Sequence, residues 1–407
     1  MSAFSPLATR LPSCFPALLS LLIALVLAQP VTATPSSQPP SAKPAPQSKT
    51  GKTAKASKSA KSPTSAKAKA TKNNSHRRAG QHKAIPQPTD SYARRAEAMQ
   101  WADEAAGRID LPAAWVREQI GQARRIPLIE QLVLPAPTPA AKNWEAYRSR
   151  FIETRRIEAG AAFWQRHRAA LERAEQTYGV PASLIVGVIG VETLYGQHMG
   201  NFRILDALAT LAFDFPAAHP RAAERQAFFK EQLDHFLRLT QRAGTDPLSI
   251  RGSYAGAMGM PQFMPSSWTH YAVDFDGDGR IDLFNSPTDA IGSVANYFKA
   301  FQWKTGMPTH YPVTLMPGQT DMDGLLAPDI LPTFSVESFT AKGAQLDGAA
   351  LQHKGPLALI ELRNGDGAPS YVAGTENFYA VTRYNWSSYY AMAVIELGEA
   401  VAERMRR

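Results

Sequence analysis

Glu192 is the carboxylic acid of this chain whose surroundings best suit proton transfer. It directly follows the apolar run 184–191, which reads LIVGVIGV. A carboxylate that lies against an apolar surface loses hydration, which disfavours its charged form and raises its pKa. A general acid working near neutral pH needs such a pKa, so Glu192 is a candidate catalytic acid. The alternative is a core glutamate that forms an ion pair with an arginine such as Arg203 or Arg251.

A second candidate region is the glycine-rich segment 252–268, which reads GSYAGAMGMPQFMPSSW. Its glycines would let a ligand lie close to the backbone, and Ser253 and Gln262 could donate or accept hydrogen bonds. Its aromatic residues, which could contact a ligand, are Tyr254, Phe263 and Trp268. A tightly packed turn that needs glycine for steric reasons has the same composition, so both interpretations stand at this point.

The third region is the acidic segment 274–282, DFDGDGRID, which has the spacing of a hand-type calcium loop. The ligands would be the carboxylates of Asp274, Asp276, Asp278 and Asp282 and the backbone carbonyl of Arg280. Asn285 stands where the bidentate glutamate is usual, so either Asn285 is a weak ligand or Asp289 completes the shell. Carboxylates this close repel one another without a cation. We expect one structural calcium and no catalytic metal; an acidic turn without metal is the alternative.

The 407 residues lack the motifs of several other enzyme classes. The single cysteine, Cys14, excludes a disulfide scaffold and a thiolate metal site. The histidines are scattered without His-Glu-x-x-His spacing, and no phosphate loop or nucleophile elbow occurs. A zinc peptidase or a serine hydrolase is therefore disfavoured.

The N-terminus has the features of a secretory signal. Arg10 precedes the apolar run 17–28, and small residues at 31–33 suit cleavage after Ala33. A membrane anchor is the alternative, but this run is shorter than the roughly 20 residues that span a bilayer. Cys14 precedes the run, whereas a lipidated cysteine follows it. We therefore expect a signal peptide at 1–33 and a mature chain without cysteine, which suits an oxidising compartment.

Residues 34–89 are rich in Lys, Ala, Ser and Pro and are expected to be disordered. The net charge of the chain is +9, yet the first acidic residue is Asp90. Residues 1–89 hold 13 Lys and Arg, which leaves 31 basic residues against 35 acidic ones afterwards. The basic stretch is interpreted as an electrostatic tether to anionic wall polymers, lipid head groups or wall-synthesis proteins, or as a plain spacer. Nucleic-acid binding conflicts with the export signal.

The elements that must position these residues are mainly helices. Apolar periodicity predicts helices at 141–178, 184–191, 221–242, 287–304 and 389–406. Residues 311–384 change to short alternating segments, including 357–362 and 378–382, around the turn 364–367. The predicted class is α+β, mainly α, with a small antiparallel β region.

Four motifs in order closely resemble the lytic murein transglycosylase B family over about residues 92–407. They are Val191-Glu192-Thr193-x-Tyr195-Gly196, the segment 256–267, the acidic loop and Tyr384-Asn385. The resemblance implies a lysozyme-like helical catalytic domain at 90–407, with a core at about 140–304, a small β-containing lobe at about 305–385 and a C-terminal helix. It also implies a substrate groove and a hand-type calcium site.

The same resemblance implies the reaction and the residues that perform it. The family cleaves the bond between N-acetylmuramic acid and N-acetylglucosamine in peptidoglycan and forms a 1,6-anhydro end without consuming water. Glu192 matches the single catalytic acid and base. Five residues match groups that hold the sugars: Ser253, Gln262, Tyr297, Tyr384 and Asn385. Tyr254 is expected to pack against the sugars or in the core.

Two alternatives remain for function. A hydrolytic muramidase of the same fold would need a second carboxylate to position water, for which Asp206, Asp214 and Glu224 are candidates. A wall-binding protein without activity would keep Glu192 for structural reasons. In every case peptidoglycan is the expected partner. The absent lipidation motif favours a soluble periplasmic form over a lipoprotein, and a monomer is expected by default.

Overall fold

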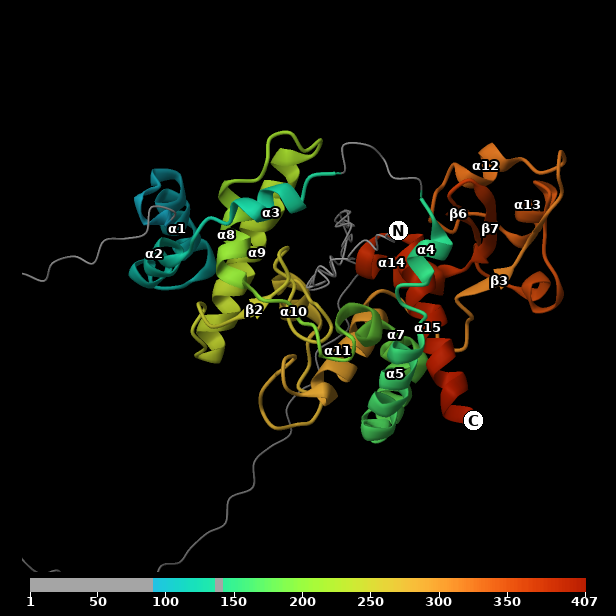
Figure 1. Ribbon diagram of the computed structural model, residues 1–407, viewed down its shortest axis with the longest axis horizontal. Coiled ribbons are helices and arrows are strands. Elements are labelled where there is room, and N and C mark those ends of the chain that lie inside the picture. The colour runs from blue at the N-terminus through green and yellow to red at the C-terminus, as the bar shows by residue number, and fades with distance from the viewer. Residues whose placement is uncertain (1–90, 136–141) are drawn as a thin grey trace, which may run out of the picture. The chain divides into compact units, whose positions relative to one another are not determined.

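The computed structural model describes residues 91–135 and 142–407, in which helices dominate and most strands are short (Figure 1). The predicted signal peptide at 1–33 and the basic stretch at 34–89 lie outside the described residues. Within the described part, no helix combines the length and apolar character needed to cross a bilayer. The mainly helical α+β class predicted from the sequence is confirmed.

One hydrophobic cluster is built by helices that are far apart in the sequence. Its elements are η1 (Tyr92–Arg94), α1 (Ala96–Ile109), α2 (Ala113–Gln122), α3 (Pro127–Leu132), α8 (Ile204–Phe213) and α9 (Ala222–Ala243). In α1 the buried residues Ala98, Trp101, Ala102 and Ala105 recur at helical spacing, so one face meets the cluster. The predicted helix at 221–242 is α9, which ends at Ala243 and is capped by Gly244 in the left-handed conformation.

A second cluster surrounds the apolar helix α7 (Ala182–Thr193), which is buried on all sides. Its other helices are α4 (Trp144–Arg148), α5 (Thr154–Arg166), α6 (Arg168–Tyr178), α11 (Pro287–Ala300), α14 (Glu376–Asn385) and α15 (Ser388–Arg406). The predicted helical region 141–178 is thus divided into three helices. Of all these, α15 packs most extensively on α7 (Figure 1).

The close packing of α7 on α15 depends on glycine. A Cβ atom added at Gly187 would overlap the carbonyl oxygen of Val394. We therefore predict that Gly187→Ala lowers the free energy of unfolding by about 2–3 kcal/mol, because the backbone of α7 or that of α15 must shift to make room for the methyl group. Urea unfolding measures this, with Gly107→Ala on the exposed side of α1 as control, where a Cβ meets nothing within 4 Å. Equal midpoints for the two variants would contradict the packing argument.

A third cluster lies beside the small sheet. Strand β7 (Gly367–Gly374) is central and pairs antiparallel with β3 (His310–Pro312) and β6 (Ala358–Asn364), while β4 (Thr314–Leu315) pairs with β5 (Ala344–Gln345). Along β6, Ala358 and Ile360 face the second cluster, whereas Leu359 faces the third. The predicted strand at 357–362 and its turn are therefore confirmed, and β6 separates two cores. The same region contains α12 (Met322–Leu326), α13 (Val336–Ala341) and η2 (Gly348–Gln352).

The predicted strand at 378–382 is wrong, because these residues lie in α14. The Thr375 hydroxyl caps this helix by accepting a hydrogen bond from the Asn377 N–H, at 3.1 Å. Phe378, Val381 and Thr382 are buried at helical spacing. Their β-branched and aromatic character suggested a strand, but the cap and the packing of one helical face decide the structure.

Three short elements lie next to the glycine-rich segment 252–268. Strands β1 (Phe202–Arg203) and β2 (Arg251–Gly252) form an antiparallel pair, and α10 (Pro265–Tyr271) follows the glycine-rich segment. The predicted helix at 287–304 is α11, which ends at Ala300.

Candidate active site

Glu192 lies in the last turn of α7 and is only 7% exposed. Burial raises its pKa to about 7, and a hydrogen bond from Tyr390 partly opposes this effect. Within the described residues Glu192 forms no ion pair. Arg203 is instead bound to Asp206, and Arg251 donates to the Asn201 carbonyl. The alternative of a core glutamate paired with either arginine is therefore wrong.

The backbone directly after Glu192 is unusually folded. Helix α7 ends because Leu194 and then Tyr195 adopt left-handed conformations, with φ of 49° and 59°, and Gly196 follows at 86°. Two consecutive non-glycine residues in this region store strain, which is common next to functional groups. The Thr193 hydroxyl holds the turn by donating to the Met260 carbonyl, at 2.8 Å, and by accepting from the Gly196 N–H.

Tyrosines surround the Glu192 carboxylate. The Tyr390 hydroxyl donates to Glu192 Oε1 at 2.6 Å, and both groups are buried. The Tyr384 ring stacks on the Tyr390 ring, with centroids 6.0 Å apart and planes at 14°. Burial, and then the nearby Glu192 charge, raise the pKa values of Tyr384 and of Tyr147, the latter to about 12. The structure thus brings predicted Tyr384 close to Glu192.

Sequence reasoning missed Tyr390 and Tyr147. Tyr390 lies 198 residues after Glu192, in the first turn of α15, and Tyr147 lies in α4. No spacing in the sequence links either residue to Glu192. Only the packing of α15 on α7 makes the Tyr390 contact predictable.

Asn385 and Tyr297, two predicted sugar-binding residues, have different surroundings. Asn385 Oδ1, at the end of α14, is buried with no hydrogen-bond partner among the described residues. A buried acceptor without a partner is costly, so this atom is suited to a ligand. The Tyr297 hydroxyl, in contrast, donates to the Arg383 carbonyl at 2.8 Å, and its ring packs on Tyr384. The Tyr297 ring therefore packs against Tyr384, while its hydroxyl is bound to the backbone.

The glycine-rich segment is a tightly packed turn. A Cβ at Gly256 would overlap the Leu208 side chain, and one at Gly259 would approach Leu283. Both glycines also have positive φ, so glycine is required for packing and conformation rather than for a ligand. Phe263 is buried in the core.

The polar residues of this segment serve the turn itself in part. The Ser253 hydroxyl accepts the Ala257 N–H at 2.9 Å, and Gln262 Nε2 donates to the carbonyls of Gly259 and Met199. Tyr254 is half-buried and packs on Phe202, with ring centroids 6.4 Å apart. The segment reaches Glu192 through the contact between Thr193 and Met260.

Three aspartates of the acidic loop lie together. One carboxylate oxygen from each of Asp274, Asp276 and Asp289 lies within 4.8 Å of the others. Asp289 is 1% exposed, and burial raises its pKa. Three carboxylates this close are unfavourable without a counter-charge, and oxygen donors suit a hard divalent cation. These residues therefore fit calcium.

The other predicted ligands make backbone contacts. Asp278 accepts the Arg280 N–H at 2.8 Å, and Asp282 accepts the N–H groups of Phe284 and Asn285, each at 2.9 Å. The Asn285 amide donates to Asp282, so its nitrogen end faces that carboxylate. Of the two residues considered for completing the shell, Asp289 lies with the cluster.

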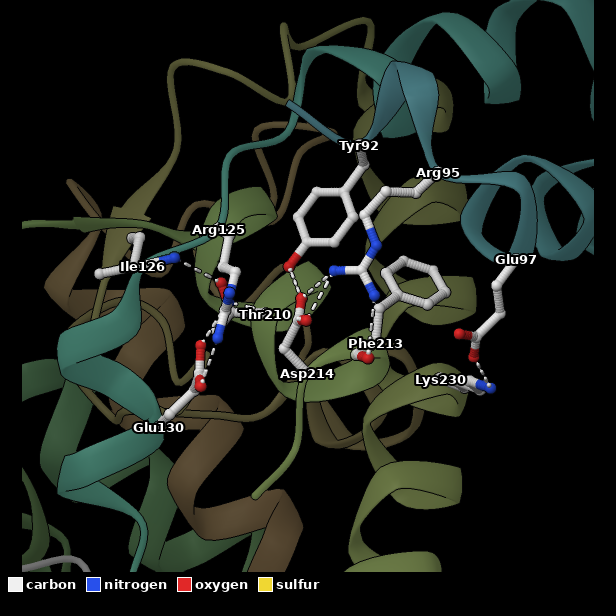
Figure 2. Close-up of polar contacts among 10 residues, drawn as sticks. All are labelled: Tyr92, Arg95, Glu97, Arg125, Ile126, Glu130, Thr210, Phe213, Asp214 and Lys230. Carbon is white, nitrogen blue, oxygen red and sulfur yellow. Dashed lines mark hydrogen bonds and ion pairs between the residues drawn. The ribbon is translucent and has the colours of Figure 1, made fainter. Parts of the chain in front are cut away.

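Asp214, one candidate for a second catalytic carboxylate, is occupied by a structural network (Figure 2). It accepts hydrogen bonds from the Tyr92 hydroxyl and from Arg95 Nη1, each at 2.6 Å. This contact raises the pKa of Arg95, and burial together with Asp214 raises that of Tyr92. Asp214 thus fastens the start of the described chain to the end of α8.

The remaining two candidates are also held by arginines. Asp206 accepts hydrogen bonds from Arg203 Nε and Nη2, both at 2.7 Å. Glu224 is exposed and pairs with Arg221 at 2.6 Å. Of the four carboxylates compared, Glu192 is the one that is buried, forms no ion pair in the described part of the chain and has a pKa near neutrality.

Comparison with known proteins identifies similar sequences over most of the chain. Residues 93–399 match the family described as the transglycosylase SLT domain. The membrane-bound lytic murein transglycosylase B of Escherichia coli (strain K12) is 40% identical over 336 residues, which are 79% of this chain and 87% of that protein.

The structure is also similar to solved structures of lytic transglycosylases. The Escherichia coli lytic transglycosylase SLT35 in complex with calcium superposes with a TM-score of 0.67 at 39% identity, covering 78% of this chain and 96% of that one. SltB3 from Pseudomonas aeruginosa in complex with NAG-NAM-pentapeptide gives 0.63 at 29% identity, covering 75% and 79%. The matched range 93–399 includes Glu192 and the acidic loop.

Proposed function

The chain belongs to the transglycosylase SLT domain family, and from that premise we propose that Glu192 alone performs the proton transfers of its reaction. The chain is a lytic murein transglycosylase, an enzyme that cleaves peptidoglycan. The observation that carries the proposal is the buried Glu192, whose pKa of about 7 lets it both give and accept a proton near neutral pH.

In the first step, protonated Glu192 donates its proton to the oxygen that bridges N-acetylmuramic acid and N-acetylglucosamine. The bond between C1 and this oxygen breaks, and positive charge develops on the muramic ring. The Glu192 carboxylate formed in this step is stabilised by the hydrogen bond from Tyr390. N-acetylglucosamine leaves with the transferred proton.

In the second step, the same carboxylate takes the proton from the C6 hydroxyl of the muramic residue. The C6 oxygen attacks C1 of its own ring and closes a 1,6-anhydro bridge, which regenerates protonated Glu192. An intramolecular attack has a high effective molarity, so neither a second carboxylate nor a positioned water is needed. The arginine pairing of Asp206, Asp214 and Glu224 agrees with this one-residue scheme.

Two predicted sugar-binding residues are proposed to contact the reacting sugars directly. Asn385 would accept a hydrogen bond from an N-acetyl or hydroxyl group, since its Oδ1 is buried without a partner in the described chain. Tyr384 would line the same place beside Glu192 with its ring, because its hydroxyl already donates to the Pro261 carbonyl at 2.6 Å. The groove wall is proposed to be shaped by Ser253, Tyr254, Gln262 and Tyr297. The polar groups of Ser253, Gln262 and Tyr297 already form hydrogen bonds with the backbone, and the Tyr254 ring packs on Phe202.

Asp274, Asp276 and Asp289 are proposed to hold one calcium ion, with Asp278, Asp282 and the Arg280 carbonyl nearby on the loop. A relative, SLT35, has been solved with calcium. Calcium would be structural here, because it neutralises the clustered carboxylates and fixes the loop that leads into α11. No catalytic cofactor is proposed.

The melting temperature is expected to be about 5 °C lower in chelator than in millimolar calcium. Linkage predicts such a difference for a ligand that binds only the folded state. Asp289→Asn is expected to abolish this calcium-dependent increment. Scanning calorimetry with calcium or with a chelator measures both. Asp366→Asn, on the exposed hairpin turn, is the control and should keep the increment. An Asp289→Asn protein that still gains stability from calcium would contradict the proposed ligand set.

Export to the periplasm is proposed from the N-terminal sequence. Residues 1–33 would be removed, and residues 34–89 would link the new N-terminus to the catalytic domain at 90–407. N-terminal sequencing of the exported protein, with Thr34 expected first, tests this division.

Mass spectrometry of products released from purified sacculi tests the proposed function. A transglycosylase leaves 1,6-anhydro ends, which are lighter by one water than the reducing ends left by hydrolysis. We expect anhydro products alone. Reducing ends would indicate a muramidase, and an absence of released fragments would indicate a binding protein.

A further inference from the structure

A pocket of about 360 Å³ lies beside the β1–β2 pair and is lined mainly by charged residues. Its charged side chains are Arg124, Arg203, Asp206 and Arg251, and its apolar wall includes Ile126 and Phe202. None of these residues has a part in the reaction described above. The lining contains three cationic groups and one anionic group.

The single carboxylate of this lining is already used. Both Asp206 oxygens accept hydrogen bonds from Arg203, and Oδ1 also accepts the Arg124 backbone N–H at 2.9 Å. The guanidinium groups of Arg124 and Arg251 are exposed and form no ion pair within residues 91–135 and 142–407. The pocket therefore has two positive charges in excess.

The strand pairing places two of these charges opposite each other. Arg203 and Arg251 are direct partners in the antiparallel β1–β2 ladder. Like charges at directly opposed positions destabilise a strand pair. Arg251 is also held in place by its hydrogen bond to the Asn201 carbonyl, at 3.1 Å. A bound anion would offset the charge of Arg251, which lies opposite the already paired Arg203, and would meet a guanidinium group that is held in place.

Both strands beside the pocket continue along the chain to residues of the candidate active site. Strand β1 follows the turn that leaves Glu192, and β2 leads directly into Ser253. The two segments touch, because a Cβ at Gly200 would overlap the Gly252 carbonyl. A substituent on a glycan bound near Glu192 and Ser253 can therefore extend along this strand pair.

We propose that the pocket binds a carboxylate of the peptide stem carried by the glycan substrate. This inference rests on the proposed function. SltB3 has been solved with a glycan that carries a pentapeptide, and a pentapeptide ends in a carboxylate. Guanidinium groups bind carboxylates with paired, charge-assisted hydrogen bonds. Arg124 and Arg251 donate these bonds, and Arg203 adds positive charge while it stays paired with Asp206.

The test compares three glycan substrates: strands with peptide stems, strands with stems removed, and strands with amidated stem carboxylates. The double variant Arg124→Gln/Arg251→Gln is expected to lose about tenfold in kcat/KM on the stem-bearing strands. Its rates on the other two substrates should equal those of the unmodified protein. Arg242→Gln, an exposed arginine at the end of α9, is the control and should behave as the unmodified protein on all three.

Binding of the same glycans to Glu192→Gln protein, measured by calorimetry with and without the arginine pair, separates this proposal from the proposed function. Tighter binding of stem-bearing glycan that disappears with the arginines supports the pocket even if no cleavage occurs. Equal losses on all three substrates, or no loss on any, would overturn the stem-carboxylate assignment. Unchanged circular dichroism confirms that the variants fold.

Discussion

Replacing Glu192 by glutamine is expected to lower the rate of glycan cleavage by about 10³-fold, within the range of general acid–base catalysis. Glutamine keeps the size of the side chain but can neither donate nor accept the proton in either step. Turnover of purified sacculi, followed by release of soluble fragments, measures the loss. Glu172→Gln, on the exposed surface of α6, is the matched control and should cleave at the normal rate.

The same substitution is expected to stabilise the protein at alkaline pH. Folding raises the pKa of Glu192 from 4.5 to about 7. Between these two values the folded protein keeps a proton that the unfolded chain has lost, so stability falls as the pH rises through this window. The penalty reaches about 3 kcal/mol above pH 7 and is absent below pH 4.5.

The glutamine variant has no such penalty. Its melting temperature should exceed that of the unmodified protein by more at pH 8 than at pH 5. An inactive variant whose melting temperature differs from that of the unmodified protein by the same amount at pH 5 and at pH 8 would show that Glu192 is not desolvated in solution. Full activity in the variant would place the acid elsewhere.

Local sequence was sufficient for Glu192, because its setting depends on residues directly before it. The run 184–191 forms one helix, and that helix is buried on all sides, so the carboxylate at its end had to be desolvated. Similarly, Asp274, Asp276 and Asp289 are brought together by the loop itself and by the first turn of α11. Short-range geometry of this kind can be predicted from spacing.

Contacts between distant segments could not be predicted in this way. The Tyr390 hydrogen bond depends on how closely α15 approaches α7, which in turn depends on Gly187 and Gly398. The arginine pocket depends on the register of two two-residue strands that no alternation pattern reveals. Residues 378–382 show the opposite error, since strong strand propensity was overridden by the cap at Thr375.

The sequence is compatible with two roles for Gly256 and Gly259, close approach of a ligand and tight packing of the turn. Each faces a leucine, Leu208 and Leu283 respectively, and each has positive φ. Sequence can locate such glycines but cannot say what faces them. In the structure both glycines face protein atoms, so neither offers a backbone surface for a ligand.

Tyr390→Phe is expected to move the alkaline limb of the pH–rate profile to higher pH by about one pH unit. The Tyr390 hydroxyl donates to Glu192 Oε1 and stabilises the charged carboxylate, which lowers the pKa of Glu192 against the effect of burial. Without this bond the pKa rises above about 7. The first step requires protonated Glu192, so the active form persists to higher pH, while the rate at the optimum falls because the carboxylate is less well stabilised and oriented.

Tyr389→Phe is the matched control, because the Tyr389 hydroxyl donates to the Arg363 carbonyl at 2.8 Å and contributes nothing to the pKa of Glu192. Its pH–rate profile should coincide with that of the unmodified protein. A Tyr390→Phe protein with a slower rate but an unmoved alkaline limb would make Tyr390 a packing residue. A limb that moves to lower pH would show that the hydroxyl stabilises the neutral acid, and Glu192 would then need another partner to act as base.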